Sequence, residues 1–108
     1  MDTIEALNSL ELRVGRITAA EPFPEARRPA YKLTVDFGDL GTRRSSAQIT
    51  QYARELLPGR LVICAFNLPP KRIAGFKSEV LVMGVDDAEG NVILLQPEVE
   101  VPLGQRVY

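Results

Sequence analysis

The sequence contains no histidine and only one cysteine, and these two shortages exclude most catalytic and metal chemistry. Without histidine there is no His general base, no Ser-His-Asp triad and no credible set of zinc or haem ligands. Cys64 lies within the apolar run 61–66, so we expect a buried, inert thiol and no intrachain disulfide. No glycine-rich stretch ends in Gly-Lys-Ser/Thr, which excludes a nucleotide-binding P-loop. We therefore expect a protein that is not an enzyme and that holds no metal or cofactor.

Aromatic residues and long apolar runs are also scarce. Aromatic side chains make up 6% of the chain, with no tryptophan, and no apolar run approaches the roughly 20 residues that a membrane span needs. The first residues lack the charged and then apolar pattern of a secretory leader. A length of 108 residues with 45% hydrophobic residues predicts one globular domain over residues 1–108. We therefore expect a soluble cytoplasmic protein without membrane insertion.

Acidic residues are few along the middle of the chain. Between Arg27 and Lys77 there are ten basic residues and three acidic ones, which gives this segment a net charge of +7. The rest of the chain carries 3 basic and 11 acidic residues, so that the whole chain has a net charge of −1. If the fold gathers the basic residues on one face, that face attracts anionic partners. If the fold mixes the two sets, no such face exists, and the sequence leaves both outcomes open.

Alternating apolar and polar residues predict two early strands, over residues 10–19 and 32–37, and a polar third strand is predicted over residues 42–47 after the turn at 38–41. In the first of these the apolar phase shifts after Gly15, which predicts a β-bulge with positive φ at this glycine and a long, bent strand. Later strands are predicted by three apolar runs, over residues 61–66, 80–85 and 92–95. The acidic turn before the last of these lacks the ligand spacing of a calcium-binding loop, so we interpret it as a solvated hairpin turn.

The sequence shows two helical patterns. One has apolar side chains at i, i+3, i+4 and i+7, at Ile49, Tyr52, Ala53 and Leu56. Pro58 and Gly59 end this pattern, which predicts a helix of two to three turns between the third and fourth strands. The pair Asp2 and Glu5 resembles a capping box and predicts a short N-terminal helix. Together the elements predict an all-β fold, the five-stranded Greek-key barrel of an OB-fold, with C-terminal extension strands.

The segment between two of the apolar runs carries cations and apolar side chains together. Pro69 and Pro70 end the preceding strand near Asn67, because proline fixes φ and lacks an N–H donor. Gly75 frees the backbone just before Phe76, which we expect to be an exposed aromatic side chain in a loop over residues 68–78. The position between two buried strands indicates a contact surface, and an ordinary solvated hairpin loop is the alternative.

Three motifs resemble the CsaA secretion chaperones: LRVGRI at 12–17, SSAQIT at 45–50 and RIAGFKSEVLV at 72–82. These chaperones are stand-alone members of the tRNA-binding OB-domain superfamily, whose other members are appended to methionyl- and phenylalanyl-tRNA synthetases. The resemblance runs from about Leu10 to the C-terminus. It implies a homodimer that binds unfolded or pre-secretory polypeptides and is linked to the export machinery. The tRNA-binding branch usually has a turn similar to Val-Ser-Gly-Leu at 45–50, so the difference argues against tRNA as the principal ligand.

The residues themselves also predict a homodimer and leave two binding functions in competition. The runs 61–66 and 80–85 are apolar on both faces, so a partner surface must cover the outside of the barrel, and a two-fold dimer is the commonest arrangement.

A polypeptide-binding chaperone needs exposed apolar area, whereas an RNA-binding module needs cations and stacking rings, for which Tyr31 and Lys32 are further candidates. The scarcity of aromatic residues favours the chaperone, and an assembly domain without a free ligand is a third class. The predicted peptide- or RNA-binding residues are Arg43, Arg44, Gln48, Leu68, Lys71, Arg72, Ile73, Phe76 and Lys77.

Overall fold

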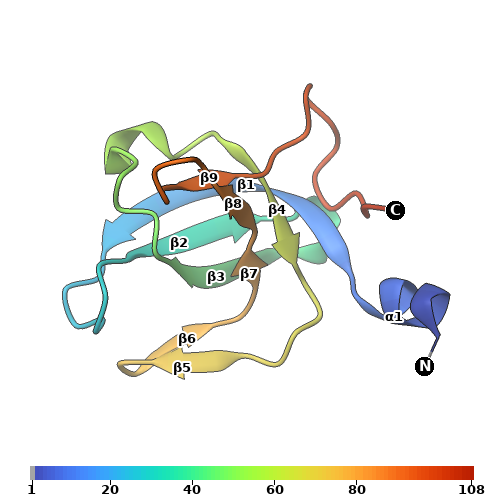
Figure 1. Ribbon diagram of the computed structural model, residues 1–108, viewed down its shortest axis with the longest axis horizontal. Coiled ribbons are helices and arrows are strands. Elements are labelled where there is room, and N and C mark those ends of the chain that lie inside the picture. Colours follow the sequence, from blue (N-terminus) through green and yellow to red (C-terminus); the bar gives the residue numbers. More distant parts are fainter. Residues whose placement is uncertain (1) are drawn as a thin grey trace.

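The computed structural model describes residues 2–108, with Leu7 described by its backbone alone. Its main strands are β1 (Leu12–Pro22), β2 (Tyr31–Asp36), β3 (Thr42–Ala47), β4 (Leu61–Ala65) and β7 (Leu81–Val82). They pair antiparallel in the order β3-β2-β1-β4-β7 and curl into a nearly closed barrel (Figure 1). This arrangement confirms the predicted all-β, five-stranded barrel of the OB-fold.

β1 serves both halves of the barrel because it is long and bent. Its second half pairs with β2 and its first half pairs with β4. The register of the β1–β2 pairing shifts between Ile17 and Ala19, which places a bulge at this point of the strand. The remaining edge of the first half is covered by residues 104–107, whose backbone forms hydrogen bonds with Leu12 and Val14.

The bulge predicted at Gly15 was therefore wrong in position, and Gly15 does not have the positive φ that was expected of it. A side chain at Gly15 would instead meet the core. A Cβ atom there would lie 2.5 Å from Cγ1 of Val35 and 2.8 Å from Cε1 of Phe37. Glycine is required because β1 passes close over the core side chains of Val35 in β2 and of Phe37 directly after it. The same residue type marks a bulge and a close approach, so the sequence could not separate the two.

The alternating apolar residues of β2 and the turn that follows it point into the barrel as predicted. Leu33, Val35 and Phe37 are completely buried and form the centre of the core. Cys64 of β4 is packed among them. Burial raises the pKa of its thiol to about 12, because the low-polarity surroundings disfavour the thiolate. The expected burial of the thiol is confirmed, and its inertness stays a prediction.

The helical element between β3 and β4 is shorter than predicted, a single turn of 3₁₀ helix, η2 (Arg54–Leu56). Leu57 is the leucine that enters the core, whereas Leu56 is 76% exposed. The hydroxyl of Tyr52 accepts a 3.1 Å hydrogen bond from the backbone N–H of Leu94, which holds the preceding turn against the barrel. Contacts with the barrel, and not a regular helix, therefore decide which apolar residues of this segment are buried.

The apolar run 80–85, predicted as one strand, is divided between β7 and the short strand β8 (Gly84–Asp86). The chain turns outward at Gly84, where a Cβ atom would lie 2.7 Å from the carbonyl oxygen of Ile93. Leu81 and Val85 are 54% and 55% exposed, so the run is not covered on both faces. Apolar area therefore remains on the outside of the barrel, and the partner surface expected to cover it stays a prediction.

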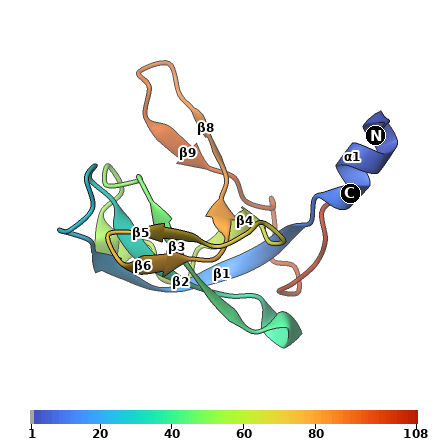
Figure 2. The same cartoon turned by 90° about the horizontal axis from the view of Figure 1, so that it is seen from below.

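Two hairpins and a helix lie outside the barrel (Figures 1 and 2). The remaining elements are α1 (Thr3–Ser9), η1 (Gly38–Leu40), the hairpin of β5 (Lys71–Ile73) and β6 (Phe76–Ser78), and the hairpin of β8 and β9 (Val92–Leu94). Asp2 caps α1 as predicted, because its carboxylate accepts a 2.8 Å hydrogen bond from the N–H of Glu5. α1 stands away from the barrel beside the C-terminal segment. No helix described between residues 2 and 108 is long and apolar enough to cross a membrane.

Candidate functional site

The segment predicted as a loop over residues 68–78 is largely a β-hairpin, formed by β5 and β6 and called the arm from here on. The turn between the two strands consists of Ala74 and Gly75, whose φ angles are 47° and 82°. Positive φ at both central residues is typical of the tight turn that joins strands through two residues. The prediction of a loop did not include these two paired strands, because only the turn chemistry of Gly75, and not that of Ala74, is visible in the sequence.

Cross-strand pairing sorts the side chains of the arm onto two faces. Arg72 lies directly opposite Lys77, and both are exposed. Ile73 and Phe76 form the next pair and, by the alternation of strands, lie on the opposite, half-buried face. Like charges that face each other across two strands destabilise the pairing. The arm therefore carries a repulsive cationic pair on its outer face and apolar side chains on its inner face, and of the pair Arg72 also reaches the groove beside the arm.

The ring of Phe76 is half-buried, so the expectation of an exposed aromatic side chain was wrong. It packs edge to face against Phe23, which lies in the loop between β1 and β2, with the ring centroids 5.4 Å apart. Lys32 Nζ lies 5.3 Å from the Phe76 centroid, and the guanidinium of Arg44 lies 4.9 Å from it. Arg44 also forms a 2.7 Å ion pair with Glu21. Phe76 therefore fixes the arm to the barrel and presents little free surface for stacking.

The base of the arm is held to β3 by the serines of the SSAQIT motif. The buried hydroxyl of Ser45 donates a 2.8 Å hydrogen bond to the carbonyl oxygen of Val80. The N–H of Ser46 donates to the hydroxyl of Ser78 at 3.1 Å. The N–H of Glu79 donates to the carbonyl of Arg44 at 2.8 Å. The motif therefore closes the barrel between β3 and β7 and sets the position of the arm.

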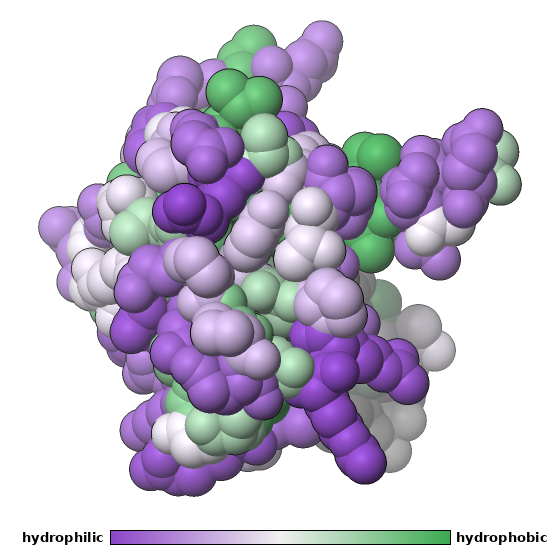
Figure 3. Space-filling view, turned by 90° about the vertical axis from the view of Figure 1, so that its left-hand side faces the viewer, coloured by the Kyte–Doolittle hydropathy of each residue, from purple (hydrophilic) through white to green (hydrophobic). Residues whose placement is uncertain are grey.

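A groove lies between the arm, the end of β3 and the loop between β1 and β2, and we call it the arm groove. It consists of two adjoining pockets of about 310 and 450 Å³, which share Ser46, Gln48, Lys71 and Ile73. The first pocket, its apolar half, continues over Leu68, Pro69, Val80 and Leu81, with Ser78 and Glu79. The second pocket, its cationic half, continues over Ala26, Arg27, Arg28, Ala30 and Arg72. The β1–β2 loop and the turn of the arm both reach the left-hand side of Figure 1, and Figure 3 shows strongly hydrophilic side chains lying next to apolar ones on that side.

The cations of the groove are exposed and lack carboxylate partners. Within residues 2–108 no Asp or Glu lies within ion-pair distance of Arg27, Arg28, Lys71 or Arg72. Among the described residues, the guanidinium of Arg72 donates only to the carbonyl oxygen of Gly75 in its own turn, at 3.3 Å. Part of the basic middle segment of the chain is thus gathered at one place in space. The charges at this place are available to an external anion.

The structure brings five of the nine predicted site residues together, and the other four lie elsewhere. Those that line the arm groove are Gln48, Leu68, Lys71, Arg72 and Ile73. Phe76 and Arg44 pack together on the barrel side of the arm, and Lys77 lies on its outer face. The guanidinium of Arg43 lies 5.0 Å from the ring centroid of Phe66, in a different contact.

The prediction missed Arg27, Arg28 and Ser46. The two arginines belong to a proline-rich loop, and the available signal was their adjacency between Pro24 and Pro29 within the basic segment. Ser46 was part of a motif but was not assigned to the site. Among residues 2–108 the structure shows no cluster of three or more Asp, Glu or Cys side chains that could hold a metal ion.

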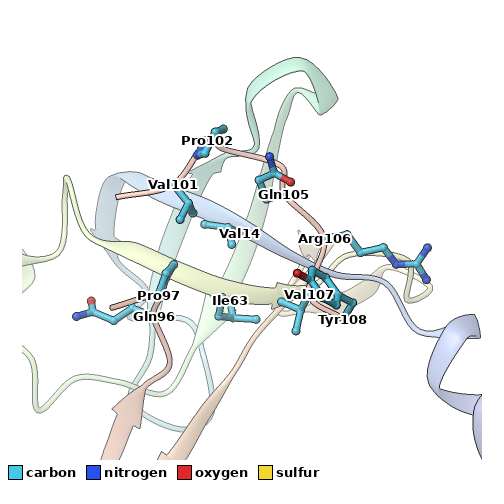
Figure 4. A pocket seen from close by; sticks show the side chains of 10 residues that line it. All are labelled: Val14, Ile63, Gln96, Pro97, Val101, Pro102, Gln105, Arg106, Val107 and Tyr108. Carbon is cyan, nitrogen blue, oxygen red and sulfur yellow. The ribbon is translucent and has the colours of Figure 1, made fainter. Parts of the chain in front are cut away.

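A second candidate surface is an apolar pocket of about 450 Å³ on the other side of the barrel (Figure 4). Val14 of β1 and Ile63 of β4 form its floor, and the C-terminal segment with Val101 and Val107 forms its rim. Tyr108 lies beside the pocket and is fully exposed. The surface that lines this pocket is mostly apolar, although Gln96, Gln105 and Arg106 stand at its border, so it has the character of a packing surface.

Comparison with known proteins places this geometry in a family. A family model described as "Putative tRNA binding domain" matches residues 12–106. Methionine–tRNA ligase of Methanocaldococcus jannaschii is 36% identical over 104 residues, which cover 96% of this chain and 16% of that protein. Methionine–tRNA ligase 1 of Sorangium cellulosum is 40% identical over 107 residues, which cover 98% of this chain and 15% of that protein. The chain therefore spans about one sixth of the length of these curated relatives.

Solved structures match over the whole chain. The chaperone CsaA of Bacillus anthracis is 50% identical with a TM-score of 0.92, and the match covers 100% of this chain and 99% of that chain. The CsaA chaperone of Picrophilus torridus is 43% identical with a TM-score of 0.92 and full coverage of both chains, 100% each. A MetRS-related protein of Pyrococcus horikoshii is 29% identical with a TM-score of 0.87, covering 100% and 98%. The chain therefore belongs to the tRNA-binding domain family and, within it, to the CsaA chaperones.

Proposed function

We propose that the protein is a chaperone that binds unfolded polypeptides in the arm groove, acts as a homodimer and is not an enzyme. The observation that carries this proposal is the composition of the groove. Leu68 and Leu81, which are 39% and 54% exposed, provide apolar contact area without a covering element of the chain. The adjoining cations hold the polar parts of a client. A surface of this kind suits extended chain segments better than one small ligand.

The relatives support a polypeptide as the ligand. The solved structures of the Bacillus anthracis and Picrophilus torridus proteins, at 50% and 43% identity, bear the name CsaA chaperone. On the strength of this relationship we propose pre-secretory polypeptides as the clients, a contact with the export machinery and a cytoplasmic location. We also propose that residues 1–108 act as one OB-fold domain in this role.

The homodimer is proposed on the apolar surface beside the C-terminal segment. The pocket over Val14 and Ile63 is open and its rim residue Val107 is 41% exposed. α1 stands off the barrel on the same side, and its Ile4 is 66% exposed (Figure 2). A second copy related by a two-fold axis would cover these groups, since a closed dimer places the same surface of each copy against the other.

A second candidate function is tRNA binding, which the cations of the groove favour. Arg27, Arg28, Lys71 and Arg72 have the charge that phosphate contacts need, and the relatives include methionine–tRNA ligases. However, single-stranded RNA also needs exposed rings for base stacking. Phe76 is packed against Phe23, which leaves the groove without such a ring. We therefore rank the polypeptide above RNA.

Two sets of substitutions separate these functions. Leu68→Ser with Ile73→Ser removes apolar area and no charge, whereas Lys71→Gln, Arg72→Gln and Lys77→Gln remove charge and little area. Leu68 is chosen over Phe76 because Phe76 also fixes the arm. Both variants are compared with the wild type for suppression of aggregation of a denatured client and for tRNA binding by fluorescence anisotropy.

For a polypeptide chaperone, the apolar variant loses most of the suppression and the charge variant retains more of it. The tRNA affinity, if present, falls steeply between about 50 and 200 mM salt, because counterions are released from phosphates. If the charge variant alone abolishes client binding and tRNA displaces the client completely, RNA is the principal ligand and the chaperone proposal fails.

A further inference from the structure

The two halves of the arm groove meet at one strand, and this continuity limits what can occupy them together. Lys71 and Ile73 of β5 line both pockets, as do Ser46 and Gln48 at the end of β3. An apolar surface over Leu68 and Leu81 therefore passes directly into a surface that carries four cations. A ligand that fills both halves must have apolar and anionic groups next to each other.

The strand β5 has a free edge beside the groove. It pairs only with β6 in the sheet that the two strands form. Paired residues in an antiparallel hairpin alternate between hydrogen-bonded and non-hydrogen-bonded positions, and Ile73 with Phe76 closes the two-residue turn. Arg72 is therefore at a non-hydrogen-bonded position, and its backbone N–H and C=O point away from β6. An extended polypeptide can add to such an edge through its own backbone.

The charges of the cationic half also require a partner. Arg72 faces Lys77 across the arm, and Arg27 and Arg28 are adjacent in the chain, so each cation has another close to it. No carboxylate of residues 2–108 forms an ion pair with any of the four groove cations. In contrast, Arg44 next to the arm is neutralised by Glu21. An external anion at the groove would relieve the like-charge repulsion.

We propose that the arm groove selects extended polypeptide segments in which acidic residues adjoin apolar ones. The acidic side chains lie among Arg27, Arg28, Lys71 and Arg72, and the apolar side chains lie on Leu68, Ile73 and Leu81. This inference rests on the proposed polypeptide-binding function and adds the class of segment that is bound. Arg27 and Arg28 of the loop between β1 and β2, which lies far from the arm in sequence, provide the preference for acidic segments.

The test uses three labelled peptides that share one set of apolar residues. The first carries Asp and Glu next to the apolar residues, the second carries Asn and Gln at the same places, and the third carries Lys. Affinities are measured by fluorescence anisotropy with the intact protein and with Arg27→Gln, Arg28→Gln and the double variant. Arg54→Gln is the matched control, because it removes one partly exposed cation outside the groove. Leu68→Ser tests the apolar half.

We expect the wild type to bind the acidic peptide about fivefold to tenfold more tightly than the amide peptide, from several exposed charge contacts. The double variant should reduce this preference to less than about twofold, while Arg54→Gln keeps it. Leu68→Ser should weaken the acidic and amide peptides by the same factor. The preference of the wild type should also fall as salt is added, which provides a second readout that needs no variant.

Equal affinity of the wild type for the acidic and amide peptides would overturn the inference, as would a preference that survives the loss of both arginines. If the protein still suppresses client aggregation in that case, the proposed chaperone function stands and only the selectivity is wrong. If no peptide binds and aggregation is not suppressed while tRNA binds, both the selectivity and the chaperone function are wrong.

Discussion

The ring of Phe76 packs edge to face against the ring of Phe23, with 5.4 Å between the two centroids. Lys32 Nζ lies 4.8 Å from the Phe23 centroid and 5.3 Å from the Phe76 centroid, so one cation lies over both rings. The contact joins the arm to the loop between β1 and β2. These two segments also line the cationic half of the arm groove, so the contact holds two of its walls together.

The first prediction follows from this contact. Phe76→Ser should lower the free energy of unfolding by about 1–3 kcal/mol, because it removes a half-buried ring and its contact with Phe23. Ile73→Ser, on the same face of the arm but without a ring contact, should cost less. Urea denaturation followed by circular dichroism measures both. An unchanged midpoint for Phe76→Ser would show that the ring contact contributes nothing to the fold.

The strands show how far the sequence determines the fold. Leu33, Val35 and Phe37 alternate with polar residues, and this local pattern was sufficient to predict both the strand and its buried face. The helix predicted up to Leu56 was wrong, because the helical spacing selects Leu56 for the buried face, whereas the structure buries the neighbouring Leu57. Leu57 is completely buried and Leu56 is not, and only the position of the barrel decides between them.

The candidate site was predictable where its residues are close in the chain. Lys71 and Ile73 were found because the apolar and cationic pattern of the arm is local. Arg27 and Arg28 were missed because they come from a loop more than forty residues earlier, and the pairing of the strands brings them to the groove. The count of charges along the chain placed both arginines in the basic segment, but it gave no information on how far they lie from the arm in space.

The second prediction concerns Gly15. Gly15→Val should cost on the order of 1–3 kcal/mol or more, because even the first side-chain atom would overlap Val35 and Phe37 in the core. Gly59→Ala is the matched control, because a Cβ atom there meets nothing within 4 Å and only the positive φ of 94° opposes it. Thermal unfolding should therefore shift more for Gly15→Val. Equal shifts would contradict the steric explanation.

The third prediction concerns the turn of the arm. Ala74 has a φ of 47°, in the left-handed region that side chains with a Cβ atom disfavour. Ala74→Gly or Ala74→Asn should stabilise the hairpin by about 0.5–1 kcal/mol, since both residues accept this conformation readily. The backbone amide of Phe76, next to the turn, should exchange its hydrogen more slowly. Gly75→Ala should have the opposite effect, and faster exchange in Ala74→Gly would refute the assignment of strain.

The fourth prediction concerns Cys64 and pH. Burial raises the pKa of its thiol from 9.0 to about 12, so the folded protein keeps the proton over a range in which the unfolded chain releases it. The contribution of the thiol to stability is therefore complete below pH 9 and is lost as pH rises toward 12. Cys64→Ala should lack this part of the alkaline destabilisation. At mildly alkaline pH, a thiol reagent should modify the wild type only after unfolding, and rapid modification of the folded protein would contradict the burial.

The last prediction concerns the apolar pocket over Val14 and Ile63. If a second copy covers it, sedimentation equilibrium at micromolar concentration should give about twice the chain mass of 11.9 kDa. Val107→Asp places a charge on the rim of the pocket, where it would lose its hydration in the dimer, so this variant should be a monomer. Val99→Asp is the matched control. It lies on the same C-terminal segment, is 67% exposed and does not line the pocket, so it should remain a dimer. A wild type that sediments as a single species of 11.9 kDa would exclude the homodimer, and the exposed Ile4 and Tyr108 would then need another partner.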